Sequence, residues 1–313
     1  MSDPITRPAL RYHGGKFTVA PWIIRHFPPH TVYCEPFAGA ASVLLRKPPS
    51  LVEVLNDRFE DVVTFFRVLR DRPADLIRVL ELTPYARQAL LEACEPAEGN
   101  ELERARRFAV VAGQSRSGAG TRNAGGWRHQ GTPLPGRTST FATQWADTAH
   151  LWHVADRLRN VQIECDDALA IIRRYDSPQA LFYVDPPYLP ATRGTTRGTG
   201  AYHCDYTEAD HRRLADVLAT LRGSAILSAY ESDLYYDLYP TWTVITRTGR
   251  TKNNARRPTE CLWISPNARL GHEPVQLSGR HLPIRPDVGS NNEENPPSPR
   301  GRGAGGEGEE TAP

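Results

Sequence analysis

The tetrapeptide Asp185-Pro186-Pro187-Tyr188 brings together a carboxylate, two rigid imino acids and an aromatic ring. It follows the apolar run 180–184, which predicts a buried strand, so it falls at a strand's carboxyl end, where open α/β sheets bind ligands. The two prolines fix φ and remove two N–H donors, so the nearby carbonyls are held without competing ladder bonds. The carboxylate and the nearby carbonyls can accept hydrogen bonds from an exocyclic amine, and the aromatic ring can stack on the flat base that carries this amine. A loop that merely ends a strand is the alternative interpretation.

Acidic residues follow three other predicted strands in the same way. The strands are expected at residues 31–34, 51–55 and 161–165, and the acids that follow them are Glu35, Asp57 and Asp167. Because parallel strands of one sheet end at the same edge, these acids and Asp185 are predicted to line that edge together. Taken singly, Asp57 and Asp167 could each be no more than a helix N-cap.

The residues after the first predicted strand, Glu35-Pro36-Phe37-Ala38-Gly39-Ala40, form a turn of small residues around one glycine. Gly39 lets the backbone approach a ligand closely. Asp57 comes about 20 positions later, at the end of the second strand, where an acid can bind a ribose diol. The G-x-G-x-x-G pattern that cradles a pyrophosphate is missing, so a nucleoside without phosphates, such as S-adenosylmethionine, is the favoured ligand. An ordinary strand-to-helix turn is the alternative for Gly39 alone.

A compact motif near the N-terminus, residues 10–16, reads Leu-Arg-Tyr-His-Gly-Gly-Lys. Its glycines bend the chain, Lys16 carries a charge suited to a carboxylate, and Tyr12 could stack on an adenine ring. Read alone, the motif is better explained as a capping turn before a helix expected at residues 19–24.

The composition is ordinary for a globular protein, with 313 residues of which 39% are hydrophobic and 24% are charged. No apolar run is long enough to cross a membrane, and the first residues lack the features of a signal peptide. The five cysteines lie far apart without a CxxC pair, which predicts reduced thiols, no metal site and a cytoplasmic location. A monomer is the default expectation for the oligomeric state.

The net charge of +2 hides basic windows without any acid, at residues 113–146, 189–204 and 241–259. Such windows favour a surface that binds a polyanion, although an arginine-rich protein can also carry them as a solvated surface. The candidate contacts to nucleic acid in these windows are Arg116, Arg122, Arg128, Arg193, Arg197, Lys252, Arg256 and Arg257. Residues 286–313 carry six acids and two arginines with almost nothing apolar, so we expect this tail to be disordered.

Strands and helices alternate along most of the chain, which predicts parallel βαβ units in an α/β fold. Further strands are expected at residues 225–228, 242–247 and 260–265, the last two as an antiparallel edge pair. Residues 73–147 interrupt the alternation with helical stretches and a long loop at 113–135. We therefore expect a catalytic domain of residues 1–72 and 148–267, an insertion of residues 73–147 and a tail of residues 268–313.

The order of these motifs resembles the Dam-like class of N6-adenine-specific DNA methyltransferases. The motifs, which cover most of residues 9–267, are Tyr12-His-Gly-Gly-Lys16, Glu35-Pro-Phe-Ala-Gly39, Asn56-Asp57, Asp167, Asp185-Pro-Pro-Tyr188, Tyr206-Thr-Glu-Ala-Asp-His211, Ile226-Leu-Ser-Ala-Tyr230 and Thr259-Glu-Cys-Leu-Trp-Ile264. The chain departs from the class at two positions. Tyr12 stands where a tryptophan is often found, and Ala41 replaces a second glycine of some members.

This resemblance implies a Rossmann-like sheet that binds S-adenosylmethionine, with residues 73–147 as a mainly helical and loop target-recognition region. The residues implied to contact the cofactor are Tyr12, Lys16, Glu35, Pro36, Phe37, Gly39, Ala40, Asp57, Asp167 and Asp185. Asp185 and the Pro186 carbonyl would accept hydrogen bonds from the target amine, next to Pro187, and Tyr188 would stack on the target base.

The implied activity is methyl transfer to N6 of an adenine extruded from double-stranded DNA, without a metal and with a restriction endonuclease as a partner to consider. One alternative is the same fold acting on adenine in RNA or on N4 of cytosine, although cytosine enzymes more often carry serine in place of Asp185. Another is a catalytically silent DNA-binding protein, which the intact Asp185–Tyr188 motif argues against. A nicotinamide-dependent oxidoreductase is disfavoured by the missing G-x-G-x-x-G pattern.

Overall fold

The computed structural model describes residues 5–95, 100–120, 125–132, 138–189, 204–247 and 260–269. Six candidate nucleic-acid contacts lie outside these ranges, namely Arg122, Arg193, Arg197, Lys252, Arg256 and Arg257. The tail that we expect to be disordered also lies outside the described residues.

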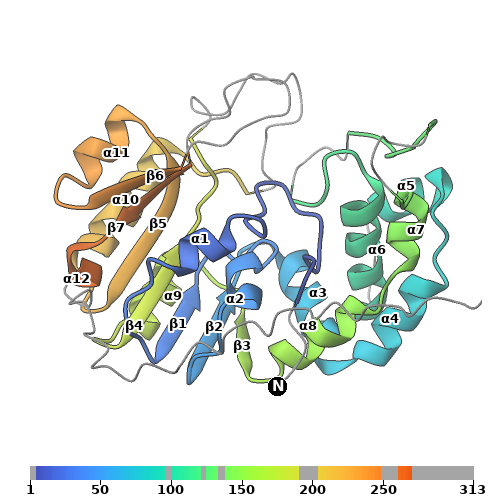
Figure 1. The fold of residues 1–313 in the computed structure, drawn as a ribbon, viewed down its shortest axis with the longest axis horizontal. Coiled ribbons are helices and arrows are strands. Elements are labelled where there is room, and N and C mark those ends of the chain that lie inside the picture. Colours follow the sequence, from blue (N-terminus) through green and yellow to red (C-terminus); the bar gives the residue numbers. More distant parts are fainter. Residues whose placement is uncertain are drawn as a thin grey trace, which may run out of the picture. The chain divides into compact units, whose positions relative to one another are not determined.

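The described strands form a seven-stranded sheet in the order β3-β2-β1-β4-β5-β7-β6 (Figure 1). They are β1 (Val32–Glu35), β2 (Val52–Asn56), β3 (Val161–Glu164), β4 (Ala180–Val184), β5 (Ser224–Tyr230), β6 (Thr243–Arg247) and β7 (Glu260–Ile264). The first five strands pair in parallel, and β7 runs antiparallel between β5 and β6. The predicted α/β fold is confirmed, as is the antiparallel pairing of the last two strands. Of that pair, only β6 lies at the edge of the sheet.

Successive residues of each central strand point to opposite faces of the sheet, and both faces are covered. In β4, Leu181 and Tyr183 join one apolar cluster, while Phe182 and Val184 join the other. All five residues of β4 are buried, which explains why the strand reads as a continuous apolar run instead of an alternating one.

The helices cover the two faces of the sheet. Their bounds are α1 (Ala20–Ile24), α2 (Ser42–Arg46), α3 (Glu60–Asp71), α4 (Pro73–Glu81), α5 (Arg87–Cys94), α6 (Glu101–Gln114), α7 (Phe141–Ala146), α8 (His150–Leu158), α9 (Ala168–Tyr175), α10 (Glu208–Ala219), α11 (Asp233–Leu238) and α12 (Pro266–Arg269). Residues of α1, α2, α3 and α8 pack on one face, and residues of α9, α10 and α11 pack on the other. Thr207 is the N-cap of α10, where Thr207 and Asp210 form a reciprocal capping box.

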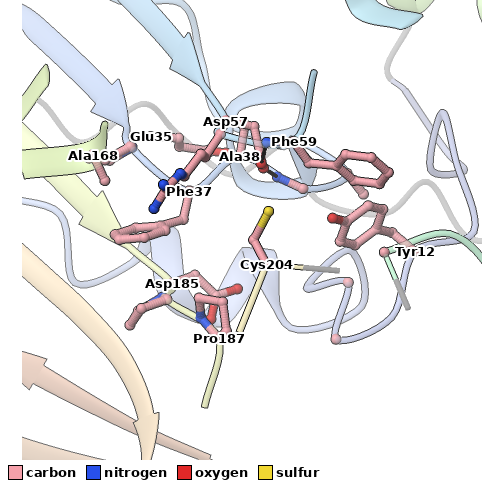
Figure 2. Close-up of a pocket in the computed structure, with 18 of the residues that line it drawn as sticks. Tyr12, Glu35, Phe37, Ala38, Asp57, Phe59, Ala168, Asp185, Pro187 and Cys204 are labelled. Atoms are coloured by element: carbon pink, nitrogen blue, oxygen red, sulfur yellow. Dashed lines mark hydrogen bonds between the residues drawn. The ribbon is translucent and has the colours of Figure 1, made fainter. Parts of the chain in front are cut away.

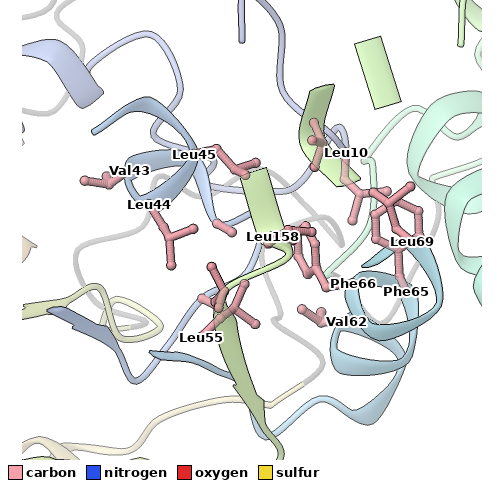
Figure 3. Packing of buried hydrophobic residues seen from close by; sticks show 14 of the residues in the cluster. Leu10, Val43, Leu44, Leu45, Leu55, Val62, Phe65, Phe66, Leu69 and Leu158 are labelled. Carbon is pink, nitrogen blue, oxygen red and sulfur yellow. The ribbon is translucent and has the colours of Figure 1, made fainter. Parts of the chain in front are cut away.

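The helices that follow residue 73 share a core with the sheet. Figure 3 shows part of this core, in which Phe65, Phe66 and Leu69 of α3 pack near Leu158 of α8. Leu76 of α4 and Phe108 of α6 belong to the same buried cluster. Helices α4 and α6 are therefore anchored on α3 through apolar packing, and the division of the chain into a catalytic domain and an insertion of residues 73–147 stays a prediction.

Candidate active site

The strand order reverses between β1 and β4, and a cavity opens at the carboxyl ends of these two strands (Figure 2). Such a switch point is where open α/β sheets bind their ligands, because the loops that leave the two strands diverge to opposite faces. The cavity is lined by every one of the ten residues that the sequence assigned to the cofactor, and by Pro186 and Pro187. Residues as far apart as Tyr12 and Asp185 therefore share one site.

Asp185 forms a partly buried ion pair with Lys16. The Nζ atom of Lys16 lies 3.1 Å from Oδ1 of Asp185 and also donates a hydrogen bond to the Gly14 carbonyl at 3.0 Å. Burial raises the pKa of Asp185 to about 6, while the Lys16 ammonium opposes this rise. Lys16 thus helps to keep the Asp185 carboxylate ionised and oriented at neutral pH.

Tyr188 lies deeper than its predicted stacking role requires. Its ring is buried and packs edge-on against Tyr230, with ring centroids 4.5 Å apart. Its hydroxyl hydrogen-bonds to Oε2 of Glu260 at 3.0 Å and lies 3.1 Å from the Ser228 hydroxyl. The Lys16 ammonium sits 4.8 Å from the ring centroid. Stacking of this ring on a base stays a prediction, and it requires the ring face to become accessible.

Glu35 fastens the end of β1 to helix α2. Its Oε1 atom accepts hydrogen bonds from the Leu44 N–H at 2.6 Å and from the Tyr33 hydroxyl at 2.8 Å. Burial raises the pKa of Glu35 to about 8, against the effect of these hydrogen bonds. The carboxyl group is therefore largely protonated at neutral pH, and it supports the cavity wall as a neutral group.

Asp57 clamps the turn after β1. Its two carboxylate oxygens accept hydrogen bonds from the N–H groups of Gly39 and Phe59, both at 2.8 Å. Gly39 has φ of 49° and Ala41 has φ of 51°, so this turn requires the left-handed conformation twice. Ala41, at the position where some members of the class carry glycine, accepts this strained backbone conformation and is fully buried.

Asp167 caps a helix and also lines the cavity, while its contact with the cofactor stays a prediction. Its Oδ1 atom accepts hydrogen bonds from the N–H groups of Leu169 and Ala170, which makes it the N-cap of α9. The residue also lines the cavity. Capping the helix and facing a ligand are therefore compatible here.

Sequence reasoning missed the structural role of Asn56. Its side chain is fully buried and donates hydrogen bonds to the carbonyls of Pro36 at 2.9 Å and Asp166 at 3.1 Å. Its Oδ1 atom accepts from the Asp166 N–H at 2.9 Å. One amide thus holds together the loops after β1, β2 and β3. The sequence signal that could have pointed to Asn56 is a polar residue at the end of an apolar strand.

Two further parts of the wall were also missed. Cys204 and Tyr206 line the cavity from the segment before α10, and the Tyr206 ring meets Phe37 edge-on at 5.4 Å. Gly120 lines it from the insertion. None of these residues stands beside a predicted strand end, so strand position offered no signal for them.

Two of the candidate nucleic-acid contacts are described. The Arg116 side chain is exposed, while the guanidinium of Arg128 stacks on the Phe141 ring at 3.6 Å. The buried amide of Gln114 braces this region, because its main-chain carbonyl accepts from the Arg128 N–H and its side chain bonds the Pro84 carbonyl. Trp127 is partly buried against Tyr85, so it is at least in part a packing residue.

Within the described ranges, no group of three or more histidine, cysteine or acidic side chains is arranged to hold a metal ion. No described helix is both long enough and apolar enough to cross a membrane. None of the five cysteines forms a disulfide.

Comparison with protein families identifies the chain. Residues 12–95 and 130–253 match the model of the D12 class of N6 adenine-specific DNA methyltransferases. The chain belongs to this family. Its reaction is therefore site-specific methylation of adenine in DNA, and the alternatives of a cytosine or RNA substrate, a silent binding protein or a nicotinamide-dependent enzyme are set aside.

Curated relatives agree with this assignment. The chain is 25% identical over 264 residues to a DNA adenine methylase of Salmonella typhi, covering 80% of this chain and 91% of the relative. It is 25% identical over 268 residues to the type II methyltransferase M.MjaIII of Methanocaldococcus jannaschii, covering 76% of this chain and 89% of the relative. The type II methyltransferase M1.LlaDCHI of Lactococcus lactis is also 25% identical, with 80% of this chain covered. The chain thus spans nearly the whole length of these methyltransferases.

Proposed function

We propose that S-adenosylmethionine is the methyl donor and that it binds in the cavity between the ends of β1 and β4. We further propose that Asp185 and the Pro186 carbonyl hold the N6 amine of an adenine extruded from double-stranded DNA. The observation that carries the proposal is that the glycine turn at residues 35–40 and Asp185 face the same cavity (Figure 2).

The side chains around the cavity fit this cofactor. Tyr12, Phe37 and Tyr206 offer aromatic surface to an adenine ring. The Asp57 carboxylate accepts backbone N–H bonds from Gly39, Arg58 and Phe59, and of its about four lone pairs one is left to accept a ribose hydroxyl.

An orphaned hydroxyl supports a polar ligand in the same cavity. The Ser42 Oγ atom is buried in the cavity wall and has no hydrogen-bond partner among the described residues. Leaving a buried polar group without a partner costs about 1–3 kcal/mol, so a ligand that bonds this hydroxyl would recover that free energy. The amino-acid end of S-adenosylmethionine carries both donors and acceptors for such a bond.

The chemistry follows from the position of Asp185. When bound, S-adenosylmethionine supplies an electrophilic methyl group. The amine N6 of adenine is a weak nucleophile, because its lone pair is delocalised into the ring. Hydrogen bonds from N6–H to Asp185 and to the Pro186 carbonyl localise this lone pair, and a rigid Pro-Pro backbone keeps the acceptors aligned. Lys16 contributes by holding Asp185 ionised and in place.

The remaining parts of the proposal concern partners. We propose that residues 73–147 recognise the DNA sequence, that the protein acts as a monomer in the cytoplasm, and that a restriction endonuclease is a partner to test. Two relatives are named type II methyltransferases, which supports a restriction endonuclease partner for those relatives. The exposed side chain of Arg116, which lies within residues 73–147, supports DNA recognition by this region.

The test is transfer of labelled methyl from S-adenosylmethionine to unmethylated duplex DNA, followed by nucleoside analysis. We expect N6-methyladenine with the wild type and with Asp216→Ala, in which an exposed acid outside the cavity is replaced. Asp185→Ala should substantially keep cofactor and DNA binding but lose transfer by at least about a hundredfold. Near-normal turnover in Asp185→Ala, or label in N4-methylcytosine, would contradict the proposal.

A further inference from the structure

A short segment of the insertion, residues 115–120, returns to the N-terminal motif and pairs with it. The Ala119 N–H donates to the Arg11 carbonyl, and the His13 N–H donates to the Ala119 carbonyl, both at 3.0 Å. These bonds form a parallel bridge between Tyr12 and Ala119, more than 100 positions apart in sequence. The insertion is therefore hydrogen-bonded directly to the motif that carries Tyr12 and Lys16.

The Tyr12 ring lies against two glycines, one from each part of the chain. A Cβ atom on Gly39 would lie 3.0 Å from Cε1 of Tyr12, and a Cβ atom on Gly120 would lie 2.5 Å from Cζ of the same ring. Gly120 has φ of 89°, and both glycines line the cavity. A Cβ atom on Gly120 would overlap the ring, and one on Gly39 would press tightly against it, so both glycines limit where Tyr12 stands in the cavity.

The same segment carries a candidate contact to DNA on its outer side. The guanidinium of Arg11 donates hydrogen bonds to the main-chain carbonyls of Ser115 and Arg116. The side chain of Arg116 is exposed, while Ser115 is fully buried. A displacement of residues 115–120 would therefore move both the Arg116 backbone and the support of the Tyr12 ring.

We infer that residues 115–120 belong to both binding sites, with Gly120 as a positioning residue for Tyr12 and Arg116 as a contact to duplex DNA. Binding of S-adenosylmethionine and binding of DNA are then coupled through this segment. A DNA contact at Arg116 would hold in place the segment that supports the Tyr12 ring, so DNA should favour cofactor binding, and linkage makes the effect reciprocal. This inference rests on the proposed function, since it requires that Tyr12 contacts the cofactor.

A matched pair of glycine variants tests the positioning role. Gly126 lies in the same insertion with a similar φ of 81°, but a Cβ atom there would meet nothing within 4 Å. Gly120→Ala and Gly126→Ala therefore both place alanine at a similar left-handed φ, and only the first places a Cβ atom against Tyr12. In calorimetric titration of the full-length protein with S-adenosylmethionine, we expect Gly120→Ala to bind about tenfold more weakly than Gly126→Ala. Equal dissociation constants for the two variants would overturn the inference.

A second background separates the collision from general misfolding. In a Tyr12→Ala protein, the three atoms nearest to the methyl group added by Gly120→Ala are gone. In that background, Gly120→Ala should therefore weaken cofactor binding by less than about twofold. An undiminished effect in that background would contradict a role through Tyr12. If the wild-type protein itself fails to bind S-adenosylmethionine, the proposed function fails, and not only this inference.

The coupling is measured by repeating the titration with saturating unmethylated duplex DNA. We expect DNA to tighten cofactor binding in the wild type and in Gly126→Ala by about fivefold or more, and to have little effect in Gly120→Ala. The same factor in all three proteins, or no effect of DNA in the wild type, would show that the segment does not couple the sites.

Discussion

The Nζ atom of Lys16 lies 3.1 Å from Oδ1 of Asp185, which joins the N-terminal glycine motif to the end of strand β4 inside one cavity. The Lys16 ammonium influences the protonation state of Asp185, the residue proposed to hold the target amine. Burial alone would favour the neutral form of Asp185, and the nearby ammonium works against it.

Replacing Lys16 should move the pH dependence of methyl transfer. An ionised Asp185 is needed to accept the N6–H bond, so the wild-type rate should fall as the pH drops through about 6. In Lys16→Met the pKa of Asp185 rises further, and the midpoint should shift upward by about one pH unit. The measurement is kcat/KM from pH 5 to 9, and a midpoint that stays in place or moves down would refute the role of Lys16.

Replacing Glu35 should change how stability depends on pH. Because burial raises its pKa from 4.5 to about 8, the folded state holds a proton between these values that the unfolded state has released. Wild-type stability should therefore decrease as the pH rises from about 4.5 to about 8. Glu35→Gln keeps an acceptor oxygen but has no group that titrates in this pH range.

Urea unfolding at pH 5 and at pH 8 measures this effect. Between pH 5 and pH 8 the wild type should lose free energy of unfolding. Over the same range, Glu35→Gln should lose at least about 1 kcal/mol less. A difference between the proteins that is the same at both pH values would mean that Glu35 does not titrate in this range.

Two substitutions of Tyr188 separate its ring from its hydroxyl. Tyr188→Phe removes the bonds of the hydroxyl to Glu260, Ser228 and the Asp185 carboxyl group but keeps the ring, so turnover should stay within about threefold of the wild type. Tyr188→Ala removes the surface proposed to stack on the base, which should cost turnover about tenfold to a hundredfold. Steady-state rates on duplex DNA give the answer. Similar losses in both variants would show that the hydroxyl, and not stacking, is the important part.

Arg116 should contribute to the salt dependence of DNA binding. If its exposed guanidinium contacts a phosphate, Arg116→Ala should reduce the slope of log K against log salt concentration by about one. Arg72→Ala is the control, because Arg72 is bonded to Asp75 on the surface of α4. Anisotropy titrations from 50 to about 300 mM salt compare the slopes. An unchanged slope would remove Arg116 from the phosphate contacts.

The elements of the fold could be read from local patterns. The apolar run 180–184 predicted a buried strand, and it reads as one continuous run because both faces of the central sheet are covered. The convergence of Glu35, Asp57 and Asp185 was also predictable, since parallel strands end at one edge.

Other features depend on contacts between segments that are distant in sequence. The approach of Gly120 to Tyr12 and the bonds from Asn56 to Pro36 and Asp166 have no periodic signature, because backbone hydrogen bonds do not depend on side-chain identity. The burial of Tyr188 was equally invisible, since it depends on where β7 and Glu260 pack.

The sequence by itself determined the α/β class and the edge of the sheet where the candidate residues gather, because hydrophobic periodicity and strand ends are local properties. The assignment of these residues to methyl transfer came from the resemblance of their motifs to the Dam-like class. Only the tertiary structure decided that Lys16 pairs with Asp185, that Glu35 is a neutral support and that the insertion forms part of the cavity wall. Each of these depends on desolvation or on close approach of distant backbone, and both exist only after the chain has packed.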